Sequence, residues 1–69
     1  MKRLVDTQIK ESGGAVLKAS IYHTEEDGFS IDYLINNEAV KTEQFSGKSI
    51  FYVEDAVENW FSGIKILNS

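Results

Sequence analysis

At 69 residues the chain has room for one domain, and 11 acidic against 7 basic side chains give it a formal net charge of −4. It has no cysteine, which excludes disulfide cross-links and thiolate zinc sites as sources of stability. We therefore expect a single domain over residues 1–69 whose core is built from apolar side chains. No apolar run reaches the length of a membrane span, so we expect a cytoplasmic protein without membrane contact.

The charges are unevenly distributed along the chain. Residues 1–23 carry a formal charge of +2, whereas residues 24–58 carry −7. A surface of the latter sign repels phosphate backbones and attracts basic partners. The alternative interpretation is that the acidic side chains only keep a small domain soluble.

The first two predicted strands flank a glycine turn. The side chains of residues 4–10 alternate between two faces of a strand, and one face holds Val5, Thr7 and Ile9. Residues 15–23 alternate more regularly, with an apolar face made of Leu17, Ala19 and Ile21. Between the two strands, Gly13 and Gly14 tolerate the positive φ angles that a tight turn requires.

Two further strands follow an acidic loop at residues 24–28. Residues 29–35 form the most regular alternation, with Phe29, Ile31, Tyr33 and Ile35 on one face. Asn36 and Asn37 favour the next turn, because asparagine accepts left-handed backbone geometry. Residues 39–45 are more polar and predict an edge strand or a short element.

The segment 49–64 predicts an amphipathic helix. Ser49 is a candidate N-cap, and an apolar stripe at three-to-four spacing contains Ile50, Val53, Val57, Trp60 or Phe61, and Ile64. Glu54 and Asp55 are expected near the N-terminus, where the helix dipole favours acidic groups. Gly63 fits the left-handed position that commonly ends a helix, and residues 64–67 are a last short strand or an ordered tail.

These elements predict an α+β fold. We expect an antiparallel β-meander of three or four strands with one C-terminal amphipathic helix packed on one face.

Several short patterns partly match metal-binding or phosphate-binding motifs. His23 is the sole histidine and has no second imidazole or thiolate at metal-ligand spacing. Residues 25–28 lack the alternating oxygen ligands and terminal glutamate of a calcium loop, and Gly47-Lys48-Ser49 lacks the earlier glycine of a phosphate loop. The sequence therefore predicts no catalytic residue, no metal site and no cofactor, and we do not expect an enzyme.

Nucleic-acid binding is a competing function. Tyr22 and Lys18 share a polar face, and Phe29, Tyr33 and Tyr52 could supply stacking rings. However, Phe29 and Tyr33 are in phase with apolar neighbours, and the acidic balance opposes binding of a polyphosphate. A protein partner is therefore expected in preference to nucleic acid.

The chain also resembles a type I-F anti-CRISPR protein over roughly residues 17–64. The resemblance rests on Ala19-Ser20-Ile21-Tyr22, the acidic and asparagine turns, and the helical run Glu58-Asn59-Trp60-Phe61-Ser62-Gly63-Ile64. That family has a short β-meander followed by a helix with an E-x-W-F-x-G-hydrophobic run. Residues 1–12 have no counterpart, and residues 47–52 change the spacing before the helix. The resemblance implies a phage-encoded protein that binds a host or phage protein.

The sequence thus predicts a small non-enzymatic, acidic protein-interaction module. Its candidate contacts for a basic partner surface are Glu25, Glu26, Asp27, Glu54, Asp55 and Glu58. The alternatives are a self-associating domain, such as a homo-dimer joined through an edge strand, and a single-stranded nucleic-acid-binding sheet.

Overall fold

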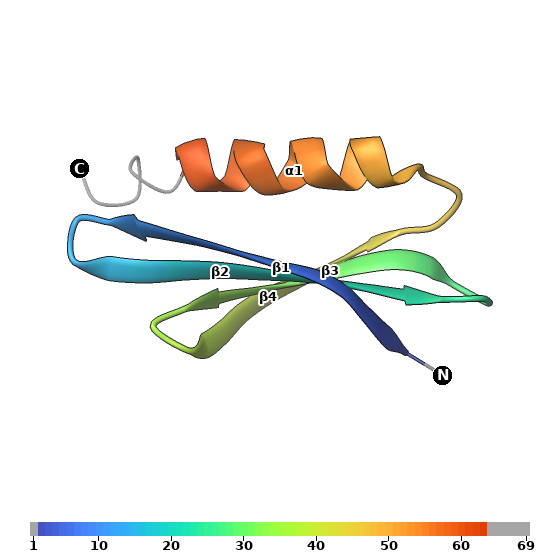
Figure 1. Ribbon diagram of the computed structural model, residues 1–69, viewed down its shortest axis with the longest axis horizontal. Helices are drawn as coiled ribbons and strands as arrows, with labels where there is room; N and C mark the ends of the chain where they lie inside the picture. Colours follow the sequence, from blue (N-terminus) through green and yellow to red (C-terminus); the bar gives the residue numbers. More distant parts are fainter. Residues whose placement is uncertain (1, 64–69) are drawn as a thin grey trace.

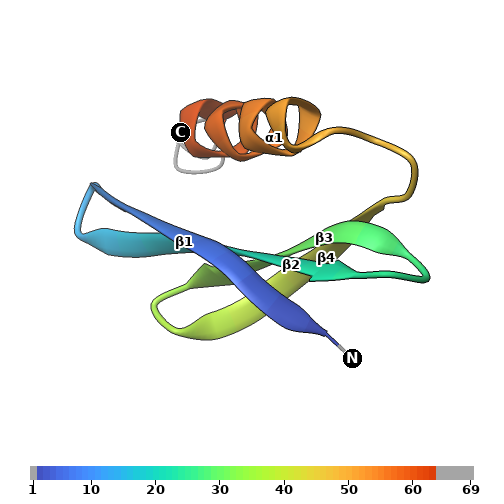
Figure 2. The same cartoon turned by 45° about the vertical axis from the view of Figure 1, so that its right-hand side comes forward.

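One antiparallel sheet and one helix make up the fold. The computed structural model describes residues 2–63. The strands are β1 (Arg3–Ser12), β2 (Ala15–Thr24), β3 (Gly28–Ile35) and β4 (Glu38–Phe45), and the helix is α1 (Ile50–Gly63). The sheet order β1-β2-β3-β4 follows the sequence, and α1 runs back along one face of the sheet (Figure 1, Figure 2). The predicted α+β meander with a helix on one face is confirmed, with four strands. The short strand or tail predicted at residues 64–67 lies outside the described residues.

Two tight turns set the register of the meander. Gly13 and Gly14 have φ angles of 56° and 84°, and Asn36 and Asn37 have 51° and 69°, so both predicted turns are confirmed. The second turn is also tied to β2. The Asn36 N–H donates to the carbonyl of Val16 at 2.8 Å, and the Val16 N–H donates to Asn36 Oδ1 at 2.9 Å. These reciprocal bonds hold the β3–β4 turn against the start of β2.

The core lies between α1 and the middle of the sheet. Its buried side chains are Ala19, Ile21, Ile31, Tyr33, Phe45, Val53 and Val57. Val53 and Val57 are fully buried and lie on the helix face that contacts β2 and β3. Phe29, Trp60 and Phe61 pack around this cluster and are partly buried. The predicted apolar faces of residues 15–23 and 29–35 and the predicted helix stripe therefore meet in one core.

The ends of α1 differ from two expectations. The Ser49 carbonyl accepts a hydrogen bond from the Val53 N–H at 3.3 Å, as an N-cap residue does. Because the helix begins at Ile50, Glu54 and Asp55 fall beyond its first turn, which holds no acidic residue. The predicted dipole interaction is therefore wrong, since that effect fades within one turn. The prediction that Gly63 adopts a left-handed conformation is also wrong, because Gly63 is still helical and has no positive φ.

The first strand turns its apolar side away from the helix. Thr7 and Ile9 pair with Ser20 and Lys18, which lie on the opposite face of β2 from the core residues. The register shifts between Leu4 and Asp6, and this bulge brings Leu4 onto the same face as Thr7 and Ile9. The apolar side of β1 is therefore not part of the core. We call this side of the sheet, opposite α1, the open face.

An isoleucine-to-alanine substitution should cost much more stability on the helix side of the sheet than on the open face. Ile31 is fully buried under α1, so Ile31→Ala should lower the free energy of unfolding by about 2–5 kcal/mol. Ile9 is 61% exposed on the open face, so Ile9→Ala should change it by less than about 0.5 kcal/mol. Urea unfolding followed by the fluorescence of Trp60 measures both. Equal losses for the two variants would contradict the assignment of faces.

Candidate interaction surfaces

The open face is an uncovered, mixed polar and apolar surface. No described element lies over it (Figure 2). Its cross-strand rows run from Ile9 through Lys18 and Leu34 to Ala39, from Thr7 through Ser20 and Asp32 to Thr42, and from Leu4 through Tyr22 and Ser30 to Gln44. The middle row is polar, whereas the row that begins at Ile9 carries three apolar side chains and the row that begins at Leu4 carries two apolar or aromatic ones.

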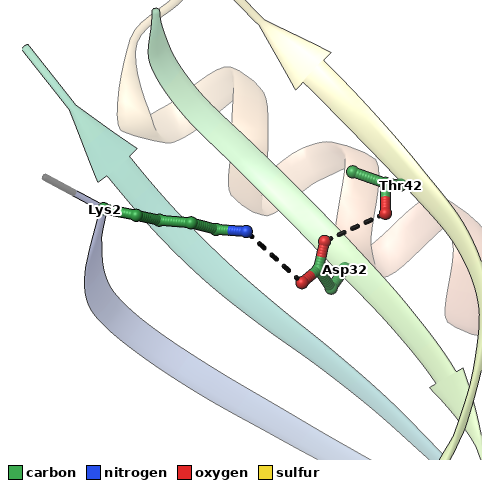
Figure 3. A network of polar contacts seen from close by, with 3 residues as sticks. All are labelled: Lys2, Asp32 and Thr42. Carbon is green, nitrogen blue, oxygen red and sulfur yellow. Dashed lines mark hydrogen bonds and ion pairs between the residues drawn. The ribbon is translucent and has the colours of Figure 1, made fainter.

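Asp32 is the charged centre of the open face. Its Oδ2 lies 3.7 Å from Lys2 Nζ, and its Oδ1 accepts a hydrogen bond from Thr42 Oγ1 at 3.0 Å (Figure 3). Lys2 Nζ also lies 4.4 Å from the centre of the Tyr22 ring, in a cation–π contact. Lys2 therefore reaches from the beginning of the chain across β2 to β3. Such exposed pairs contribute little stability, so their main effect is to order these side chains.

The apolar side chains of the open face are well exposed. Leu4 and Ile9 are 54% and 61% exposed, and Tyr22 and Leu34 are half-buried. Ser20 and Ser30 are nearly buried, because small side chains are screened by their larger neighbours on a sheet. Exposed apolar side chains that gather on one face of a small domain commonly mark a binding surface.

A second candidate surface is an open groove of about 400 Å³ between β4 and α1, which we call the β4–α1 groove. Its lining residues are Tyr33, Lys41, Glu43, Phe45, Tyr52, Asp55, Ala56, Asn59 and Trp60. The rings of Tyr33 and Trp60 lie 4.6 Å apart, and those of Phe45 and Tyr52 lie 5.9 Å apart. The groove therefore combines aromatic surface with a few charged groups, as ligand sites commonly do.

Tyr33 and Glu43 form the most buried polar contact of the groove. The Tyr33 hydroxyl donates to Glu43 Oε1 at 2.8 Å, and Glu43 Oε2 lies 3.8 Å from Lys41 Nζ. Burial, followed by the hydrogen bond and the charge of Glu43, raises the pKa of Tyr33 above its ordinary range. The phenol therefore stays protonated in the folded protein and can act there as a hydrogen-bond donor.

The six acidic residues expected to bind a partner lie on two different elements. Glu25, Glu26 and Asp27 form a hairpin trio in the turn between β2 and β3, and all three are exposed. Glu54, Asp55 and Glu58 form a helix trio on the exposed surface of α1. Within the helix trio, Asp55 lines the β4–α1 groove, where its Oδ2 accepts from Asn59 Nδ2 at 3.4 Å. Their role in partner binding stays a prediction.

His23, the residue considered as a metal ligand or catalytic group, lies at the end of a strand beside an aromatic ring. The His23 ring lies half-buried at the end of β2, 4.8 Å from the Phe29 ring. Across residues 2–63, no three His, Cys, Asp or Glu side chains gather as metal ligands would. Within the same residues, no helix has the length and apolar character of a membrane span.

The aromatic rings considered for nucleic-acid stacking lie on both sides of the sheet, and of the two that line the β4–α1 groove, Tyr33 and Tyr52, only Tyr52 is exposed. Tyr33 is buried in the core, and Phe29 packs against that core, as predicted. Tyr22 lies on the open face, whereas Tyr52 is exposed on α1, on the other side of the sheet. A single strand stacked on successive rings needs those rings side by side. The described geometry therefore does not favour that function.

Comparison of the chain with protein-family models, with curated proteins and with solved structures found no match. Its function must therefore be argued from its own geometry.

The raised pKa of Tyr33 predicts a loss of stability at alkaline pH. Above about pH 10, the ordinary pKa of tyrosine, the unfolded chain releases the phenol proton while the folded chain retains it. The stabilisation from this group is therefore complete below that pH and is lost as the pH rises further. The measurement is the free energy of urea unfolding at about pH 8 and about pH 11.

Tyr33→Phe is the matched variant for this measurement. It keeps the ring that packs on Trp60 and removes the ionisable hydroxyl. We expect its stability to fall less between the two pH values than that of the wild type, whatever its absolute stability. Parallel losses for both proteins would show that Tyr33 does not contribute to the pH dependence.

Proposed function

We propose that the protein is a small non-enzymatic interaction module that binds another protein through its open face. One observation carries this proposal: residues 2–63 leave a whole sheet face uncovered and place Leu4 and Ile9, 54% and 61% exposed, upon it. Exposed apolar side chains are costly in water and are hidden when a partner docks. A polar centre around Asp32, ordered by Lys2 and Thr42, would give such a contact its specificity.

A role in binding agrees with the arrangement of the polar groups on this face. Asp32 is engaged by Lys2 and Thr42 on the open face, which no described element covers. A catalytic group usually lies in a cleft with a second group aimed at the reacting atom. The resemblance to type I-F anti-CRISPR proteins supports the further proposal that the chain is phage-encoded, acts in the cytoplasm and inhibits its partner.

Self-association is a second candidate function. Within the described residues β1 pairs only with β2, and β4 pairs only with β3, so the outer edge of each is unpaired. An unpaired edge can join that of a second copy, and a small domain gains core by doing so. In this alternative a second copy that pairs with the outer edge of β1 lies beside Leu4 and Ile9.

Site-specific photo-crosslinking tests the proposed surface. A photoreactive phenylalanine analogue is placed at Leu4, at Ile9 or at Lys10, in cells that naturally produce the protein. Lys10 is the matched control, because it neighbours Ile9 on β1 but is paired with the core residue Leu17 and points to the other face. We expect the same partner to be crosslinked from Leu4 and Ile9, and not from Lys10.

Each result of this experiment decides between the candidates. A single foreign protein captured from both open-face positions supports the proposal. Crosslinked species at twice the mass of the chain support self-association instead. Equal capture from Lys10, or none from Leu4 and Ile9, would overturn the open face as the binding surface.

The acidic trios can be tested in the same crosslinking experiment. One variant reverses the hairpin trio (Glu25→Lys, Glu26→Lys, Asp27→Lys), and a second reverses the helix trio in the same way. If a trio contacts a basic partner, its reversal should lower the yield from Ile9 by about tenfold. For the wild type, the yield should fall as salt rises, because exposed charges are screened beyond about 8 Å at physiological ionic strength. Unchanged yields in both variants, with circular dichroism spectra of folded protein, would exclude these acidic contacts.

A further inference from the structure

The outer edge of β4 offers an unpaired strand beside the β4–α1 groove. β4 is the last strand of the sheet, and its hydrogen bonds within the described residues are made to β3. Alternate amides and carbonyls of β4 therefore point outward, away from β3. Such an edge can accept one more strand through main-chain hydrogen bonds.

The regular part of β4 is directed at the groove. A register shift opposite Tyr33 and Leu34 divides the strand, and residues 41–45 continue with regular pairing. Lys41, Glu43 and Phe45 alternate along that part on the same side as α1, and all three line the groove. Because an added strand continues the alternation of its neighbour, every second side chain of that strand would point to the helix side of the sheet.

The wall that such side chains would meet is aromatic and negatively charged. Tyr52 is 54% exposed on α1, its ring lies at 61° to the Phe45 ring, and Lys48 Nζ lies 4.9 Å from its centre. The exposed part of this ring can contact an apolar or aromatic side chain. Asp55 is exposed and forms no ion pair among the described residues, whereas the carboxylate of Glu43 already has Lys41 beside it. A basic side chain is therefore the complement of Asp55.

We propose that the β4–α1 groove binds an extended peptide segment of another protein, added to β4 as a fifth strand. The segment places an apolar or aromatic side chain against Tyr52 and Phe45 and a basic side chain against Asp55. Main-chain bonds to β4 supply affinity, and the groove selects alternate side chains. This surface lies across the sheet from the open face, so the proposal does not depend on the function proposed above.

A second copy of the chain is a poorer occupant of the same edge. On the helix side, its β4 carries Glu38 and Glu43 against Lys41, a net charge of −1, and would bring this charge towards a groove that already holds Glu43 and Asp55 against its own Lys41. Like charges placed opposite each other in a sheet are destabilising. The charge pattern therefore favours a basic segment over self-pairing at β4.

Synthetic peptides can test this directly with the full chain. The probes are short acetylated and amidated peptides in which threonine alternates with lysine and tyrosine, and matched probes carry glutamate in place of lysine. Trp60 is the only tryptophan and lines the groove, so its fluorescence reports occupancy. We expect saturable binding of the lysine probe and at least about tenfold weaker binding of the glutamate probe.

Two modifications distinguish strand addition from a general attraction between charges. Asp55→Lys should weaken binding of the lysine probe by about tenfold. Glu11→Lys makes the same change of charge at an exposed position on β1, the opposite edge of the sheet, and should leave binding unchanged. In the probe, N-methylation of every second amide should abolish binding, whereas methylation of the intervening amides should be tolerated, because only one set faces β4.

The outcomes separate this proposal from the others. No saturable binding at about 1 mM peptide, or an N-methylation effect without alternation, would overturn the groove as a peptide site. A rise to dimeric mass in light scattering that is lost on Asp55→Lys would assign the groove to a second copy instead. Crosslinking from Leu4 and Ile9 is measured independently, so the proposed function can stand or fail without this one.

Discussion

The packing of α1 on β2 and β3 is the contact on which the rest of the structure depends. A sheet has two faces, and the described chain has a single helix with which to cover them. Val53 and Val57 are fully buried against strand residues that include Ile21 and Ile31. A two-layer domain of this size has no other source of apolar burial, since a bare sheet with both faces in water is marginal at best.

This one-sided core explains where the candidate surfaces lie. The helix is narrower than the sheet, so it buries the two central strands and leaves β4 with a groove at its flank. The open face is then exposed to solvent. Between its apolar residues it carries serine, threonine and charged residues, which water solvates well. Both candidate binding surfaces therefore exist because the single described helix covers only part of one face of the sheet.

The parts of the fold that depend on local chemistry could be predicted from the sequence. Gly13-Gly14 and Asn36-Asn37 fix tight turns through their own backbone preferences, and Val53 and Val57 mark the helix face through spacing alone. The face of the sheet on which the apolar side chains of β1 lie could not be predicted in this way. Its apolar residues alternate as a core strand would, and only the pairing of Ile9 with Lys18 shows that they face outward.

The candidate surfaces were only partly visible in the sequence. The polar side of β2, with Lys18 and Tyr22, could be read from alternation, but its apolar neighbours Leu4 and Leu34 come from other strands. The β4–α1 groove has no local signal, because Tyr33, Lys41 and Asp55 meet only after the helix has folded back. The division of the acidic candidates between a hairpin and a helix could be predicted, because residues 25–27 lie in the predicted acidic loop and residues 54–58 in the predicted helix.

The order of the strands also bears on how the chain reaches this structure. Each strand pairs with its neighbour in sequence, and two of the three turns are tight, so the sheet can form by successive short loop closures. The chain has no proline, so slow prolyl isomerisation does not delay this process. The contact that joins the most distant elements is the docking of α1 onto β2, because β3 and β4 lie between them in the chain. A meander of this kind is suited to rapid folding soon after synthesis, with the helix closing the core last.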